Sequence, residues 1–210
     1  QNLIQLVTTA HLEGFYYKPR VDKELLLRHR EGLIALSGCL NGEIPKAILA
    51  RKPERAEALI REYQEIFGKE NFYLELGAHP AIPEQRIVND ALVGLAAKTG
   101  ARLVGVNDVH YAKPEDREAQ DILVSVQTAS RYDDEERLSM KADDFSLKST
   151  QEMADFFREL PEAIANTQEI AERVRLEIPL CKILLPPFPV PPGFCVTTDA
   201  FRRLVPRRLR

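Results

Sequence analysis

The stretch ARLVGVND (101–108) is an apolar run of strand length that ends in two polar residues. A run this short, with Gly100 before it, is typical of a buried β-strand. The residues before it, 84–99, repeat apolar side chains at three- and four-residue steps, which predicts an amphipathic helix that ends at Gly100. A helix leading into a buried strand is the repeating unit of a parallel α/β sheet. We expect this helix to bury Ile87, Val88, Ala91, Leu92, Leu95 and Ala96.

Two more apolar runs of strand length lie upstream of this unit. LIALS (33–37) leads into Gly38 and Cys39, and NFYLEL (71–76) follows a helical pattern that begins at Pro53. Downstream, Pro114 begins another helical pattern. The alternation of strands and helices predicts parallel strands joined by right-handed crossovers. The predicted buried face of the downstream helix comprises Ala119, Ile122, Leu123 and Val126.

The last third of the chain is less regular. Residues 130–144 form a charged, loop-like stretch, and helices are predicted from Ser149 and from Pro161. Seven of the fourteen prolines follow Ile178, several of them in LPPFPVPPG (185–193). Such a density forbids regular helix and suits an extended connector. The sequence therefore predicts one domain over 1–185 and, over 186–210, a linker with the start of another.

The composition is that of an ordinary globular protein, with 44% hydrophobic and 29% charged residues and a net charge of −3. This charge balance does not by itself indicate a nucleic-acid partner, so any DNA contact must come from local basic clusters. The sequence contains no apolar run long enough to span a membrane. Its cysteines form no disulfide framework, which favours a reducing, cytoplasmic location. They are Cys39, Cys181 and Cys195.

Metal-ligand chemistry is concentrated at two predicted strand ends. Asp108 and His110 are two residues apart, so in an extended backbone both side chains lie on one face. Cys39 ends another strand of the same predicted sheet and could add a thiolate, which gives a mixed set of donors suited to zinc. The plainer interpretation of Cys39 is a small buried hydrophobic residue, and Asp-x-His pairs also occur by chance.

Two other polar segments allow more than one interpretation. In AHLEGFYYKPR (10–20), Lys18 and Arg20 could bind a phosphate backbone while the neighbouring aromatic side chains stack on bases. The simpler alternative is a structured loop whose aromatic side chains pack inward. His79 follows a predicted strand, which makes it a candidate support for a metal site, but a solvent-facing loop histidine is the simpler expectation.

Five collinear blocks carry a family resemblance. They are AHLEGFYYKPRVD (10–22), EGLIALSGCLNGEIP (31–45), PEQ within IPEQRIVN (82–89), VNDVHYAKPED (106–116) and FSLKSTQEM (145–153). In order and spacing these blocks resemble the polymerase-and-histidinol-phosphatase (PHP) domain of bacterial DNA polymerase III α subunits. LPPFPVPPG is similar to the link from that domain into the polymerase palm.

The resemblance implies an α/β fold, a distorted TIM-like (β/α)7 barrel lacking here its N-terminal strands, with a cluster of divalent metal ions at the strand ends. The implied cation is zinc, with manganese and magnesium as alternatives. Its late ligands would be Cys39, Asp108 and His110, about three of some nine; the others would precede Gln1. The loop GAHPAIPEQ (77–85) departs from the family's usual NHGLPEQ, which puts the role of that loop in doubt.

The implied activity is metal-dependent 3′–5′ exonuclease proofreading within a DNA-directed DNA polymerase. Its partners would be primer–template DNA and holoenzyme subunits, including a sliding clamp and a proofreading subunit. One alternative is a non-catalytic scaffold that stabilises the polymerase and docks a separate proofreading subunit. Another is a free-standing phosphoesterase acting on a small phosphate monoester. The palm aspartates are absent from this sequence, so we expect this chain alone to extend no primer.

Overall fold

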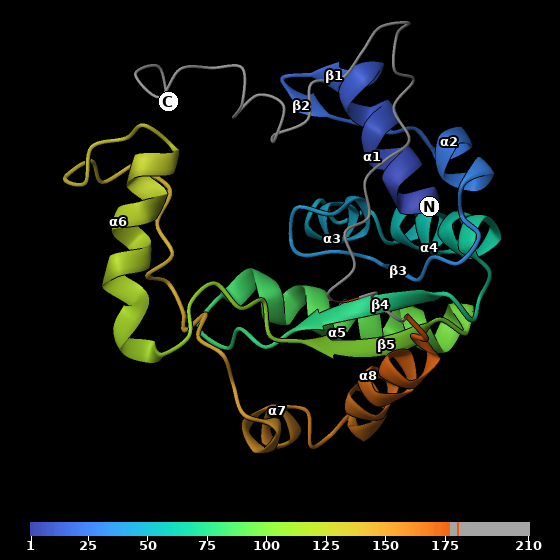
Figure 1. The fold of residues 1–210 in the computed structure, drawn as a ribbon. Helices are drawn as coiled ribbons and strands as arrows, with labels where there is room; N and C mark the ends of the chain where they lie inside the picture. Colours follow the sequence, from blue (N-terminus) through green and yellow to red (C-terminus); the bar gives the residue numbers. More distant parts are fainter. Residues whose placement is uncertain (177–179, 181–210) are drawn as a thin grey trace, which may run out of the picture. The chain divides into compact units, whose positions relative to one another are not determined.

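The computed structural model describes residues 1–176 and residue 180, and Gln1–Val174 form one compact unit (Figure 1). The predicted boundary near residue 186, the linker 186–210, Cys181 and Cys195 lie outside the described residues. The helices are α1 (Asn2–Leu12), α2 (Lys23–Arg28), α3 (Glu43–Leu49), α4 (Pro53–Phe67), α5 (Pro83–Thr99), the 3-10 turn η1 (Pro114–Asp116), α6 (Arg117–Gln127), α7 (Thr150–Phe156) and α8 (Pro161–Arg173). The strands are β1 (Phe15–Tyr16), β2 (Lys18–Pro19), β3 (Ala35–Leu36), β4 (Phe72–Gly77) and β5 (Arg102–Val106).

The centre of the unit is a parallel sheet in the order β3-β4-β5. Tyr73 of β4 lies opposite both Leu36 and Arg102, so β4 is the central strand. The prediction of parallel strands in one sheet is therefore confirmed. Its boundaries need adjustment, because the first strand is only two residues long and the third ends at Val106. Gly38 takes a φ of 79°, a turn that glycine makes without strain, and ends the first strand before Cys39.

Helix α4 begins at Pro53 and α5 ends at Thr99, as the sequence predicts, and α5 begins at Pro83, one residue before its predicted start. Pro53 and Pro83 stand in the first turn of each helix, where the missing N–H costs no hydrogen bond. Gly100 ends α5 in the left-handed conformation, with a φ of 68°. Both helices contact β4, and α8 packs against β5 (Figure 1). Ile87 was predicted to be buried on α5, and that prediction is wrong, because the residue is 55% exposed.

The core joins these helices to both faces of β4. Phe72, Leu74 and Leu76 are almost completely buried, and α3, α4, α5 and α8 each add apolar side chains to the same cluster. Phe157, directly after α7, packs on the sheet so closely that a Cβ at Gly105 would lie 2.7 Å from its ring. Among the described residues, no helix is long and apolar enough to cross a bilayer.

Helix α6 overturns the predicted buried face. Ile122, Leu123 and Val126 are 47%, 60% and 73% exposed, whereas Asp121 on the other face is completely buried. In Figure 1, α6 stands apart from the sheet, so within residues 1–176 the core does not cover its apolar stripe. The buried face of the helix instead carries Asp121, Val124 and Ser125, and Arg137 of the loop that follows forms an ion pair with Asp121.

Candidate metal centre

The end of β5 brings Asp108 and His110 together. Asp108 Oδ1 lies 3.3 Å from His110 Nε2. The predicted proximity is found, but its predicted cause is wrong, because the strand has ended and Asp108 takes a left-handed φ of 48°. Asp is among the residues that tolerate this conformation, at some cost in free energy, and such strain often occurs at functional sites.

A segment far along the chain holds this turn in place. The His110 N–H donates to the Phe145 carbonyl at 2.9 Å, and the Asn107 side-chain amide donates to the Ser146 carbonyl at 3.0 Å. Tyr111 and Ser146 form a parallel bridge. Contacts from a segment 35–39 residues away therefore fix the turn that carries Asp108.

Cys39 reaches the same end of the sheet from β3. Its side chain is exposed, so the plainer interpretation of a buried hydrophobic residue is wrong. Cys39 and Asp108 line one small cavity of about 10 Å³. That volume holds about one water-sized atom or ion.

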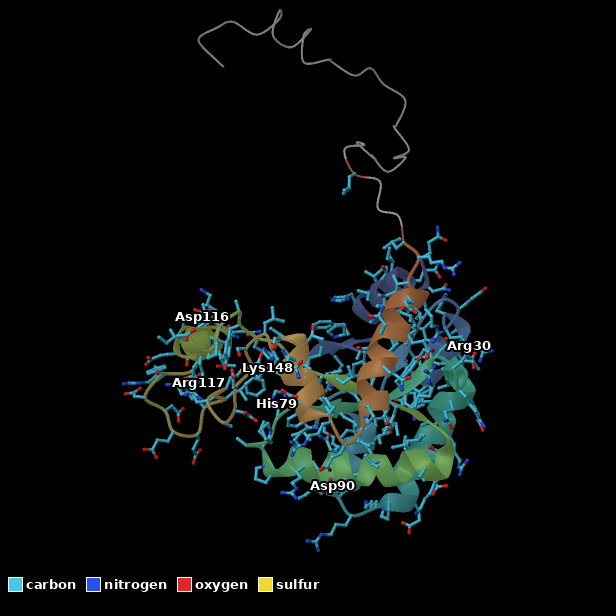
Figure 2. The ribbon with its side chains drawn as sticks, turned by 90° about the horizontal axis from the view of Figure 1, so that it is seen from below. Arg30, His79, Asp90, Asp116, Arg117 and Lys148 are labelled. Atoms are coloured by element: carbon cyan, nitrogen blue, oxygen red, sulfur yellow. The ribbon has the colours of Figure 1, made fainter. Side chains whose placement is uncertain are left out.

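His79 is the residue that the sequence misjudged most. Its side chain is 4% exposed, and its ring packs 4.4 Å from the ring of Phe145. Nε2 lies 3.8 Å from Asp108 Oδ2, and Nδ1 lies 3.8 Å from Asp143 Oδ2. Figure 2 shows His79 beside Lys148. The expectation of a solvent-facing histidine is wrong; its position after a buried strand was the informative signal.

Two opposing effects act on the pKa of His79. Burial lowers the pKa of its imidazole, and the carboxylates of Asp143 and Asp108 act in the other direction. Neither ring nitrogen has a hydrogen-bond partner among the described residues. A buried polar group without a partner is rare and indicates a ligand, an ion or a functional constraint.

Glu75 of β4 is a site residue that the sequence analysis passed over. It lines the cavity beside Cys39 and Asp108. Burial and the nearby charge of Asp108 raise the pKa of its carboxyl, while the Gly38 N–H works against them. The signal was available, since Glu75 is the one charged side chain in the apolar run NFYLEL.

This donor set suits a divalent cation. A thiol, two imidazoles and carboxylates form the mixed set that zinc accepts, and the unpartnered nitrogens of buried His79 fit the same interpretation. Within residues 1–176, however, no three such side chains form a group ready to hold an ion by themselves. The ligand set of Cys39, Asp108 and His110 therefore stays a prediction, of which the structure shows the Asp108–His110 contact and the cavity shared by Cys39 and Asp108.

Lys18 and Arg20, the predicted DNA contacts, belong to the hairpin in which β1 pairs with β2: Lys18 lies in β2 and Arg20 directly follows it. Lys18 and Arg20 are exposed, and the rings of Tyr16 and Tyr17 are 68% and 82% exposed. Phe15 is also 60% exposed. The alternative in which these aromatic side chains pack inward is therefore wrong.

Known proteins resemble this chain over all or most of its length. Residues 1–79 match the family model "PHP domain". The chain is 43% identical over 209 residues to the DNA polymerase III subunit alpha of Treponema pallidum, and 43% identical over 195 residues to that of Borreliella burgdorferi. It is 41% identical over 199 residues to that of Thermus aquaticus. These alignments cover 92–100% of this chain but only 16–18% of the relatives' length, and they confirm the resemblance that the sequence blocks indicated.

Proposed function

We propose that this chain is the C-terminal two-thirds of the PHP domain of a replicative DNA polymerase III α subunit, and that this domain removes mismatched primer 3′ ends by metal-dependent hydrolysis. The observation that carries the proposal is the gathering of Cys39, Glu75, His79 and Asp108 at the carboxyl ends of parallel strands. Functional groups of parallel α/β folds lie at this end. The sheet would form part of a distorted (β/α)7 barrel.

Asp108 and His110 would hold the cations, with Cys39 as a soft ligand, and further ligands would come from the parent protein outside this chain. Divalent cations such as zinc, manganese or magnesium supply a nucleophilic water at neutral pH and neutralise charge on the phosphodiester. The buried wall formed by His79 and Phe145 excludes bulk water from one side of the site.

Lys18 and Arg20 would contact the DNA backbone. Their exposed positions beside exposed tyrosine rings support this role, because a cation next to an aromatic surface suits single-stranded nucleic acid. Sliding clamp and proofreading subunit would bind through the parent chain, in the cytoplasm.

The test is Asp108→Asn in the full-length parent protein. Loss of one ligand charge should reduce bound metal and 3′–5′ hydrolysis at least about ten-fold and leave primer extension unchanged. Asp90→Asn, an exposed carboxylate on α5, is the matched control (Figure 2). Hydrolysis that persists unchanged in Asp108→Asn, with extension intact, would overturn the catalytic proposal.

That outcome would favour the second candidate, a non-catalytic scaffold that docks a separate proofreading subunit. One observation supports it. Helix α6 exposes Ile122, Leu123 and Val126 as one apolar stripe, and amphipathic faces of this kind often bind partners. The same experiment separates the two candidates, since a scaffold would lose nothing when Asp108 changes.

A further inference from the structure

We propose that His79 is a further metal ligand, sharing an ion with Asp108 through Nε2, and that the negative charge of Asp143, 3.8 Å from Nδ1, favours the tautomer with its proton on Nδ1. The inference rests on the metal centre proposed above. It assigns a role to the GAHPAIPEQ loop, where the sequence departs from the family pattern, and it extends the ligand set beyond Cys39, Asp108 and His110.

The distance between His79 and Asp108 distinguishes a direct hydrogen bond from a pair of ligands that share one ion. Nε2 and Oδ2 are 3.8 Å apart, which is too long for a hydrogen bond. Two donors that each bind one zinc ion at roughly 2.0–2.2 Å can lie up to about 4 Å apart. The separation therefore fits two ligands of one ion. The 3.3 Å between His110 Nε2 and Asp108 Oδ1 fits the same arrangement.

The placement of the single proton on the neutral imidazole ring supports this assignment. A neutral imidazole carries one N–H and one lone pair. His79 has a carboxylate on each side, at 3.8 Å from Nδ1 and from Nε2. If Nδ1–H points to Asp143, the lone pair of Nε2 faces the Asp108 carboxylate, and the two repel each other. A cation between them removes that repulsion.

The surroundings fix the ring in this orientation. His79 is 4% exposed and packs on Phe145, so the imidazole has little freedom to turn toward solvent. Asp143 is held in turn, because its Oδ2 accepts the Ala81 N–H at 3.0 Å. That hydrogen bond ties the Asp143 loop to the loop that carries His79. Asp143 does not hydrogen-bond Nδ1 at 3.8 Å, but its fixed carboxylate places a negative charge beside that nitrogen, on the side where metal-bound histidines commonly have a carboxylate.

The experiment measures zinc binding to the full-length parent protein, with Zn²⁺ alone as the probe. His79→Leu removes both nitrogens at similar volume and should weaken zinc affinity at least about ten-fold. Asp143→Asn keeps the shape of the side chain and should weaken it by about ten-fold. His11→Gln, on exposed helix α1, should leave affinity unchanged. In the cobalt-substituted protein, His79→Leu should also shift the visible absorption bands, since a nitrogen ligand is lost.

Zinc affinity within two-fold of the parent in His79→Leu, with unchanged cobalt bands, would overturn the inference. If Asp108→Asn weakens zinc binding and His79→Leu does not, only the role of His79 fails. If neither does, the metal centre itself fails. The unfolding temperature in chelator verifies that each variant folds; should His79→Leu not fold, Asp143→Asn carries the test, and its unchanged affinity would count against the arrangement.

Discussion

Two clusters of this molecule each bury an ionisable side chain, and they treat it in opposite ways. On α6, Asp121 is completely buried and accepts hydrogen bonds from Arg137, from the Ser139 hydroxyl at 2.7 Å and from the Met140 N–H at 3.2 Å. Lys141 Nζ lies 3.4 Å from Asp121 Oδ2. At the strand ends, His79 is also buried, at 4% exposed, and has no hydrogen-bond partner among the described residues.

The difference indicates a structural role for Asp121 and is consistent with the ligand role proposed for His79. A buried charge with all its partners fixes one conformation, and here it attaches the loop after α6 to the helix. A buried polar group without partners contributes no such stability and calls for another explanation, such as a bound ion or a catalytic role. Asp121 should therefore matter for folding, and His79 for ligand binding.

The largest effect is expected from Asp121→Asn. Removing one partner of a buried ion pair leaves the other without compensation, and we expect the α6 segment to lose about 3 kcal/mol, the lower end of the usual range, because a single loop covers the pair. Hydrogen exchange of the α6 amides in the full-length protein measures this loss. The sheet should be unaffected, since α6 stands apart from it (Figure 1). If the exchange rates of the α6 amides were unchanged in this variant, Asp121 would not be what holds α6 to the loop that follows it.

A smaller effect is expected from acid. The guanidinium of Arg137 donates to Asp121 and holds the pKa of that carboxyl well below its usual range. A depressed pKa in the folded state gives stability that is fully present above the ordinary carboxyl pKa, near about 4, and is lost as the pH falls further. Exchange protection of α6 should therefore be constant between about pH 5 and 7 and decline below about pH 4. In Asp121→Asn this decline should be much reduced; an equally steep decline there would assign it to other groups.

The smallest effect is expected from His79→Leu in metal-free protein. Because the ring nitrogens make no hydrogen bonds to the part of the chain that the structure describes, an apolar side chain of similar size should change the free energy of unfolding by less than about 0.5 kcal/mol. Denaturant unfolding in the presence of a chelator measures it. A loss of several kcal/mol would mean that the imidazole stabilises the fold directly, and the contrast with Asp121 would disappear.

Local sequence rules were sufficient for most of the fold. The prolines at 53 and 83 and Gly100 mark helix ends because their backbone restrictions act on their immediate neighbours. The apolar runs at 71–76 and 101–106 predicted parallel strands because they are short, buried and alternate with helices. The face of α6 could not be predicted, because its orientation depends on Arg137, sixteen residues from Asp121 along the chain.

The candidate site likewise has a part that the sequence predicted and a part that it could not predict. The sequence by itself determined that Cys39, Asp108 and His110 follow strands of one parallel sheet, since strand direction and chain order suffice for that. Only the tertiary structure decided that His79 is buried, that Asp143 faces it, and that Asp108 turns through a left-handed backbone to meet His110. The physical reason is distance along the chain. The 143–146 segment supplies these contacts from more than 30 residues away, and no local preference encodes where it packs.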